Sequence, residues 1–402
     1  MIDMKFGVIL HKTTMNRGDD IQTYAAMQHL PQVDYVIDRE NTNAFRSKEG
    51  EPVAVIMSAW WLWKKWNWPP AECIIPKFVS MHMNNYSINR KSSPLYDEWL
   101  EGIGGEYFRK YGPIGVRDQT SLDFFTERGF DSYFSGCITL TLPKQKKTED
   151  AGTYVCLVDL NDRLEQAARE MLKDTGLKIK VFTHCCDFRN SDASFEERME
   201  AVEKLLTQYQ NAKFVITRRL HASLPCLAMG VPVLSVVKIE DEGNFTRWEP
   251  YSKWIHFVSN KDFRTGNFEY DFLNPPENKE DYKATREALI RDIADFVNER
   301  KDCNLPLAQV KKTPYTEQEA KEWRSKLMEF TLNKWLEEDR KFLEEKEELE
   351  KSLKRCKKII RTMENGDDIV KRLEKMDKKS KGFLKRMVKR WWVKEKTDKF
   401  MG

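Results

Sequence analysis

Two arginines and a histidine follow an apolar run in the second half of the chain. Arg218, Arg219 and His221 come directly after KFVIT (213–217), and a segment of mostly small residues, ASLPCLAMG (222–230), follows them. The apolar run predicts a buried strand, and the small-residue segment predicts a helix. A helix N-terminus has free N–H groups and a partial positive charge, so cations placed beside it favour a phosphate or carboxylate ligand. The pattern therefore predicts an anion site at this strand-to-helix junction.

Polar residues follow three other apolar runs, where they could join the same site. PIGV is followed by Arg117, and KIKVFTH ends in His184. The first apolar run leads into HKTTMNRGDD, in which Asn16 and Asp19 stand where a helix is expected to start. Because ligands bind at the carboxyl ends of the strands in such sheets, we expect these side chains to gather there.

Each of these positions also has an ordinary structural interpretation. Arg117 can bind an anion, or it can pair with the neighbouring carboxylate of Asp118. The loop around Gly18 has one glycine, whereas a dinucleotide-binding loop needs the GxGxxG pattern. It can therefore equally be a plain turn between a strand and a helix. The sequence alone leaves these alternatives open.

The first 300 residues alternate short apolar runs with amphipathic segments, which predicts βα units and a largely parallel sheet. Strands are expected at 5–10, 52–58, 113–116, 153–159, 178–184, 213–217 and 231–237. Helices are expected to start near Asp19, Ser121, Asn161, Ser194 and Leu220, and several of these starts offer a capping side chain.

A lysine-rich connector, PKQKKTEDAGT (143–153), interrupts this pattern and predicts a domain boundary. The expected fold is α/β, with two Rossmann-like domains, a cleft between them and a C-terminal helical arm. The domains are expected at 1–145 and 151–310, the second carrying His221, and the arm at 315–402.

The arm begins near Glu317 and contains a seven-residue repeat. Trp335, Phe342, Leu349, Cys356 and Met363 recur at this interval. A second stripe is interrupted by charged residues. The repeat therefore allows self-association through residues 330–363 as a short coiled coil, or packing against the body of the same chain.

A second helix is expected near the end of the chain, and it is strongly basic. Residues 371–402 carry thirteen Lys and Arg against four acidic residues. Phe383, Leu384, Met387, Trp391 and their neighbours form one apolar stripe edged by cations, which suits an anionic membrane surface at residues 381–394. The alternative is a terminal helix docked on the protein. Because the positive charge is concentrated here, nucleic acid is not an expected partner of the body.

The bulk composition excludes several classes of protein. No apolar run is long enough to cross a bilayer, and the first residues predict a buried strand instead of a secretory signal. The eight cysteines form no CxxC pair, so reduced core thiols are expected, with no metal site and no disulfide framework. We expect a cytoplasmic protein, held on the inner membrane leaflet if the terminal helix binds lipid.

Taken in order, several blocks of the chain resemble the polysaccharide pyruvyl transferase family. The resemblance spans roughly residues 5–260 and depends on NRGDDIQTYAA, GPIGVRD, FSGCITLTLP, THCCD and TRRLHASLPCLAMGVPVLSV. It implies a fold similar to the two-domain GT-B glycosyltransferases. It also implies transfer of a pyruvyl group from phosphoenolpyruvate, the donor substrate, to sugar hydroxyls of a cell-surface or capsular polysaccharide precursor, forming a pyruvate ketal. The acceptor could be a lipid-linked oligosaccharide, and no cofactor is expected.

The resemblance also implies roles for the residues of the site. The family's Arg-Leu-His motif, which contacts the donor, falls on Arg219, Leu220 and His221. Arg117 and Arg218 could add cations for the donor, although Arg218 stands where the family has small residues. His221 is the first acid/base candidate and His184 the second, because imidazole titrates near neutral pH. Asn16 and Asp19 are expected to bind substrate, with Asp19 on the acceptor hydroxyls.

Two competing interpretations remain at this stage. A GT-B glycosyltransferase that uses a nucleotide-sugar would also place Arg and His beside a diphosphate. A scaffold protein would work through the helical arm instead. The tryptophan-rich segment 58–70 either stacks on sugar or packs a loop against the core.

Overall fold

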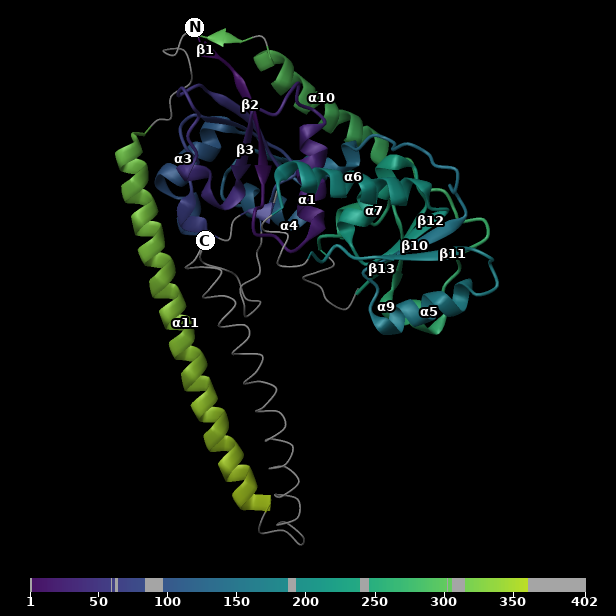
Figure 1. Cartoon of the computed structure of the whole chain (residues 1–402). Coiled ribbons are helices and arrows are strands. Elements are labelled where there is room, and N and C mark those ends of the chain that lie inside the picture. The colour runs from purple at the N-terminus through teal and green to yellow at the C-terminus, as the bar shows by residue number, and fades with distance from the viewer. Residues whose placement is uncertain are drawn as a thin grey trace. The chain divides into compact units, whose positions relative to one another are not determined.

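The computed structural model describes residues 2–58, 60–61, 64–83, 97–186, 193–238, 246–301, 303–305 and 315–360. Contacts group the chain into two compact units, Met1–Arg324 and Ser325–Gly402. The first unit is a mixed α/β structure with parallel sheets (Figure 1). It contains every residue that the sequence predicts for the site.

The first sheet is parallel and lies at the start of the chain. Its order is β3 (Tyr35–Asp38), β2 (Lys5–Leu10), β4 (Val53–Met57) and β6 (Ile74–Phe78). Helix α1 (Arg17–Met27) follows β2, and the side chain of Asn16 caps its N-terminus. The predicted strands 5–10 and 52–58 are thus confirmed as β2 and β4.

A smaller parallel pair extends this half of the molecule. Strands β8 (Ile114–Val116) and β9 (Ser132–Phe134) form it, and a bridge from Met81 to Val116 connects it to the chain after β6. Arg117 therefore emerges at the carboxyl end of β8, as the sequence predicts. The accompanying elements are β5 (Trp60–Trp61), β7 (His82–Met83), α2 (Asp97–Leu100), α3 (Gly102–Tyr111), α4 (Gln119–Thr126), η1 (Arg39–Ala44), η2 (Lys65–Asn67) and η4 (Ile138–Thr141).

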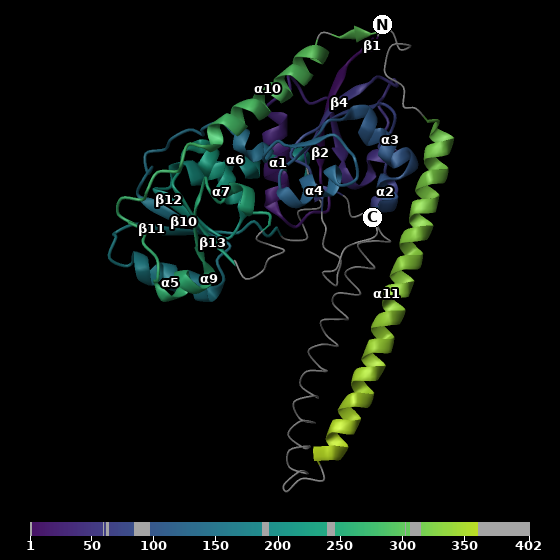
Figure 2. The same ribbon diagram turned by 180° about the vertical axis from the view of Figure 1, so that it is seen from behind.

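The second sheet is also parallel. Its order is β11 (Lys178–Phe182), β10 (Tyr154–Val158), β12 (Phe214–Thr217), β13 (Val233–Val237) and β14 (His256–Ser259). Its helices are α5 (Asp162–Leu172), α6 (Phe195–Asn211), α7 (Leu220–Met229), α9 (Asn260–Thr265) and α10 (Tyr282–Lys301). Figure 2 shows α10, which packs against η4 and β4, from behind. A short antiparallel pair joins β1 (Ile2–Asp3) to β15 (Asn304–Leu305).

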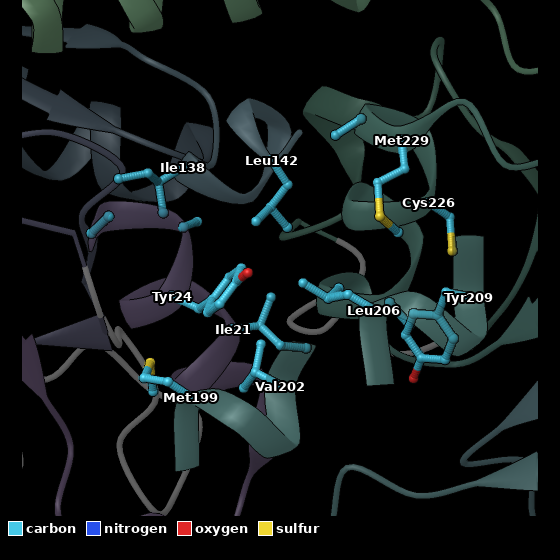
Figure 3. Packing of buried hydrophobic residues seen from close by; sticks show 14 of the residues in the cluster. Ile21, Tyr24, Ile138, Leu142, Met199, Val202, Leu206, Tyr209, Cys226 and Met229 are labelled. Atoms are coloured by element: carbon cyan, nitrogen blue, oxygen red, sulfur yellow. The ribbon is translucent and has the colours of Figure 1, made fainter. Parts of the chain in front are cut away.

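One buried apolar cluster contains residues of both sheets. Figure 3 shows Ile21 and Tyr24 of α1 beside Met199 and Val202 of α6, and the same cluster includes strand residues from β2 and β10. The connector 143–153 lies between η4 and β10 and contains no helix or strand. The division into two domains at this connector, with a cleft between them, stays a prediction.

The tryptophan-rich segment is described in part. Trp68 is fully buried, stacks on Phe108 and lies edge-on to Trp99 and Tyr107, so this member of the segment packs the core. The side chains of Trp60, Trp61 and Trp63 lie outside the described residues.

Helix α11 (Glu317–Ile360) begins where the sequence predicts a long helix. In its described part, Leu336, Phe342 and Leu343 are exposed to solvent. The predicted self-association and the role of the arm stay predictions. The basic helix at 381–394 lies outside the described residues. Among the residues described, none of the helices is both long enough and apolar enough to span a bilayer.

Candidate functional site

The start of α7 carries the Arg-Leu-His sequence and lies directly after β12. Arg219 is the N-cap residue, and its side chain makes no capping hydrogen bond, so it can point toward other partners. Leu220 is buried in an apolar cluster with Leu224 and Tyr251. The Leu220 side chain therefore anchors the helix start. The N–H groups of Leu220 and His221 lie in the first turn, where no earlier carbonyl of the helix can accept from them, whereas the N–H of Ala222 donates to the carbonyl of Arg219.

His221, one residue further, faces two other elements of the fold. Arg117 Nη1 lies 3.3 Å from His221 Nε2. Because a guanidinium only donates, Nε2 must accept this hydrogen bond, and the proton of a neutral imidazole is then on Nδ1. On the other side, a Cβ atom on Gly18 would lie 2.8 Å from His221 Nδ1, so α1 approaches the ring closely.

Arg117 is almost fully buried between these elements. Its Nη1 also donates to the side-chain oxygen of Gln22, on α1, and its backbone N–H donates to the carbonyl of Met81. Pairing of Arg117 with Asp118, one of the alternatives left open by the sequence, is not what the structure shows, because Asp118 pairs with His82 at 2.5 Å and caps α4. Arg117 is thus held against His221 and not against its neighbouring carboxylate.

Asp159 organises the other side of the site. It follows β10 with a left-handed backbone (φ 53°). Its carboxylate accepts from Arg219 Nε at 2.7 Å, from Thr183 Oγ1 at 2.6 Å and from the N–H of His184 at 3.0 Å. Arg219 Nη2 also lies 3.3 Å from Cys185 Sγ. The carboxyl ends of β10, β11 and β12 therefore meet around one carboxylate.

His184 is brought to the site but is fully buried. Its Nε2 lies 2.9 Å from the hydroxyl of Tyr209, and its carbonyl accepts from the N–H of Arg17 at 2.7 Å. Its Nδ1 has no hydrogen-bond partner among the described residues. To serve as an acid or base, His184 would have to exchange a proton while its side chain is fully buried.

Asn16 and Asp19, the two predicted residues of the loop after β2, make different hydrogen bonds. Asn16 caps α1 through Gly18 N at 3.1 Å and forms a backbone bridge with Cys185. Asp19 accepts from Thr14 Oγ1 at 2.5 Å and lies 3.3 Å from His11 Nδ1. The structure thus brings this loop onto the segment after β11.

Charges and burial shift several pKa values in the site. Burial lowers the pKa of His221 well below its ordinary value, and the positive charges of Arg117 and Arg247 lower it further. Burial also lowers the pKa of His184, to about 4. For Asp159 burial acts in the opposite direction, but the bonds from Thr183, the His184 N–H and Arg219 outweigh it and lower the pKa.

Asp19 and Arg218 are the two remaining charged residues of the predicted site. Burial opposes ionisation of Asp19, but the hydrogen bond and charge of His11 and the charge of Arg39 hold its pKa far below the usual range. Arg218 is half-buried, and within the described residues its side chain has no ion-pair partner. Burial and charge thus favour the neutral form of the His184 and His221 imidazoles and the ionised form of the Asp19 carboxyl.

Sequence reasoning did not find several residues that shape this site. Asp159 could have been found, because it occupies the same position after a strand as Arg117. Gln22 lies one turn after Gly18 on the same face of α1, and no sequence signal indicates that this face meets Arg117. Among the described residues, no group of three or more His, Cys, Asp or Glu side chains could hold a metal ion.

Comparisons with known proteins extend this picture. The family model described as polysaccharide pyruvyl transferase matches residues 16–237, more than half of the chain. No curated protein sequence matches the chain. Among solved structures, the chain is similar to one titled "S. aureus MnaA-UDP co-structure", with 9% identity and a TM-score of 0.37 over 75% of this chain and 93% of that one. A likeness this distant carries no weight in assigning a function.

The matched range begins at Asn16, the cap of α1, and ends with β13. It includes Arg117, His184 and the Arg-Leu-His sequence at the start of α7. The family is one of transferases, and the chain belongs to it: it is a member of the polysaccharide pyruvyl transferase family.

Proposed function

We propose that this protein transfers the pyruvyl group of phosphoenolpyruvate to two hydroxyls of a sugar in a polysaccharide precursor. The observation that carries the proposal is the contact of Arg117 with His221, on the first turn of α7 directly after the N-cap residue Arg219. These groups come from separate elements and provide both cations and a titratable imidazole. The proposal includes the two-domain, GT-B-like arrangement, with each half contributing one arginine.

The donor fits this set of groups by charge. Phosphoenolpyruvate carries a carboxylate and a phosphate, and each matches the forked geometry of a guanidinium. Arg219 keeps its Nε on Asp159 and its Nη2 beside Cys185 Sγ, which fixes the plane of the guanidinium and leaves Nη1 for a ligand. The free N–H groups at the start of α7 add a binding site for the phosphate.

The reaction needs one proton delivered and two removed. A proton added to the methylene carbon of the donor makes the neighbouring carbon electrophilic, and the first sugar hydroxyl attacks it and loses its proton. The second hydroxyl then displaces phosphate, which leaves with its bonding electrons as the ketal closes. We assign delivery of the first proton to His221, because it is the imidazole in contact with Arg117.

Binding of the donor would itself charge His221. Burial and the charges of Arg117 and Arg247 favour the neutral form of this imidazole. An anionic donor neutralises the arginines and adds negative charge, which raises the pKa of the ring. We therefore propose that His221 becomes an acid only when the donor is present, because Arg117 then turns from Nε2 to the donor and Nε2 can take up a proton. Asp19 stays ionised and serves as an acceptor for sugar hydroxyls instead of a base.

Thermal-shift measurement with phosphoenolpyruvate tests the donor assignment. A ligand at about 100 times its Kd stabilises the folded state by about 2.7 kcal/mol, so Tm should rise by several degrees. Arg219→Gln should reduce the rise strongly, whereas Arg169→Gln, which removes an exposed arginine on α5, should leave it unchanged. A rise with UDP-sugars but not with phosphoenolpyruvate would favour the glycosyltransferase alternative. Labelled phosphoenolpyruvate and a panel of lipid-linked glycans then identify the acceptor by phosphate release.

Gly18→Ala provides a sharper test of the geometry. Alanine normally stabilises a helix relative to glycine by about 0.5–1 kcal/mol. Here the added Cβ would lie 2.8 Å from His221 Nδ1 and 3.1 Å from His221 Cβ, so the ring must move. We expect transfer to fall about 100-fold, because a displacement of about 1 Å has this effect on a catalytic group. Initial rates and Tm measure the two effects, and a variant with the wild-type rate would contradict the placement of His221.

A further inference from the structure

Tyr251 connects the segment after β13 to Arg117. It ends the short helix η6 (Glu249–Tyr251), and its hydroxyl donates to the carbonyl of Arg117 at 2.5 Å across 134 residues of sequence. The side chain is fully buried, and burial raises the pKa of the phenol well above its ordinary value. The hydroxyl therefore stays protonated and remains a donor.

The ring of Tyr251 is also connected to the start of α7, the helix that carries His221. It belongs to the buried cluster that contains Leu220 and Leu224, on the first turns of α7. The centre of this ring lies 6.1 Å from the ring centre of Phe134, at the end of β9, and 5.6 Å from that of Trp254. Tyr251 thus lies in the same apolar cluster as the start of α7, and it donates a hydrogen bond to the carbonyl of Arg117 at the carboxyl end of β8.

The other contacts of Arg117 leave its carbonyl to Tyr251. The N–H of Arg117 donates to Met81, and its guanidinium reaches Gln22 and His221. Loss of the phenol hydroxyl would leave a buried carbonyl without its tyrosine donor, which favours a shift of the strand end. Such a shift moves the guanidinium away from His221.

We propose that Tyr251 is a positioning residue that holds Arg117 against His221. For its effect on donor binding, the inference rests on the proposed function, in which Arg117 binds phosphoenolpyruvate. For its effect on His221 it needs only the contacts of the folded protein. The two parts can therefore be tested separately.

The experiment compares Tyr251→Phe with Tyr154→Phe in the full chain. Tyr154 is the matched control, because it is equally buried and donates to a backbone carbonyl, that of Gln208, at 2.8 Å. It lies at the amino end of β10, whereas Asp159 and the site lie at the carboxyl end. Each variant loses one hydrogen bond from a phenol to a backbone carbonyl, so Tm should fall by a similar amount in both.

The first readout is the titration of His221, followed by NMR of the six histidines and assigned with His221→Gln. The charged and titratable groups that act on this ring are Arg117, Arg247, Asp19 and His184. If Tyr251→Phe releases Arg117, the pKa of His221 should move up toward its ordinary value, and Tyr154→Phe should leave it unchanged. The second readout is KM for phosphoenolpyruvate, which should rise about 5–10-fold in Tyr251→Phe alone, with a smaller change in kcat.

The outcomes separate the two proposals. A shifted His221 titration together with a raised KM supports both. If the titration shifts but the wild-type protein neither binds nor uses phosphoenolpyruvate, the positioning role stands and the donor assignment fails. If Tyr251→Phe behaves like Tyr154→Phe in the titration, Tyr251 does not position Arg117, whatever the donor.

Discussion

Replacing His221 with glutamine should lower pyruvyl transfer about 10²- to 10⁴-fold while phosphoenolpyruvate still binds. The amide oxygen of glutamine can take the place of Nε2 and accept from Arg117, so the arginine stays in position. The amide cannot carry a transferable proton. The expected loss is therefore in kcat, with KM for the donor changed little.

His29→Gln is the matched control for this variant. His29 is a largely buried imidazole just after α1, and its Nε2 lies 2.7 Å from Thr141 Oγ1, with no contact to Arg117 among the described residues. It should keep the wild-type rate of phosphate release. If His221→Gln retained even half of the wild-type rate, another group would have to deliver the proton, and His184 would be the next candidate.

The pH dependence of the reaction gives an independent check on the same residue. As an acid, His221 must be protonated, so activity is lost as the pH rises through its pKa. Burial and the charges of Arg117 and Arg247 lower this pKa in the free protein. Because a bound anion raises it, kcat should decline at a higher pH than kcat/KM, which reports the free enzyme. This basic limb should be absent from the residual activity of His221→Gln.

Replacing Arg198 with methionine should have the largest effect on stability. Arg198 donates through Nε to Asp20 at 3.0 Å and through Nη2 to the same carboxylate, and both side chains are almost fully buried. Nη2 also donates to the carbonyl of His11 at 2.9 Å. Removing Arg198 leaves a buried carboxylate whose remaining ion-pair partner among the described residues is Arg17, and this costs about 3–5 kcal/mol.

Urea or thermal unfolding measures this loss, and two further variants show whether the ion pair is its cause. Arg169→Met removes an exposed i,i+4 pair on α5 and should change stability by less than about 1 kcal/mol. The double variant Asp20→Asn/Arg198→Met removes both charges, so it should be more stable than Arg198→Met alone. A double variant that is no more stable than Arg198→Met would rule out an unpaired charge as the cause.

The sequence predicted the site from residues that follow strands. Arg117, His184 and Arg219 all stand directly after apolar runs, and parallel strands do bring their carboxyl ends together. The capping residues Asn161 and Ser194 likewise marked two helix starts correctly. The helix starts could be predicted because capping depends on local sequence alone.

The partners of these residues could not be predicted in the same way. Gln22 and Tyr251 meet Arg117 through the packing of distant elements, and neither contact has a local signature. The left-handed backbone of Asp159 also has no signature, because glycine or asparagine would be expected there. Leu220 shows the same limit, since its side chain anchors α7 in an apolar cluster while the sequence indicates only its place in the motif.

The pairing of Asp20 with Arg198 also bears on the order in which the chain is made. The two residues are 178 positions apart, so Asp20 leaves the ribosome well before its partner. At roughly 5–20 residues per second, α1 waits on the order of ten to forty seconds for α6 to be synthesised. During that interval Asp20 lacks Arg198, and Ile21 and Tyr24 of α1 lack the α6 side chains of their cluster. We therefore expect α1 to reach its native packing only after α6 has been synthesised.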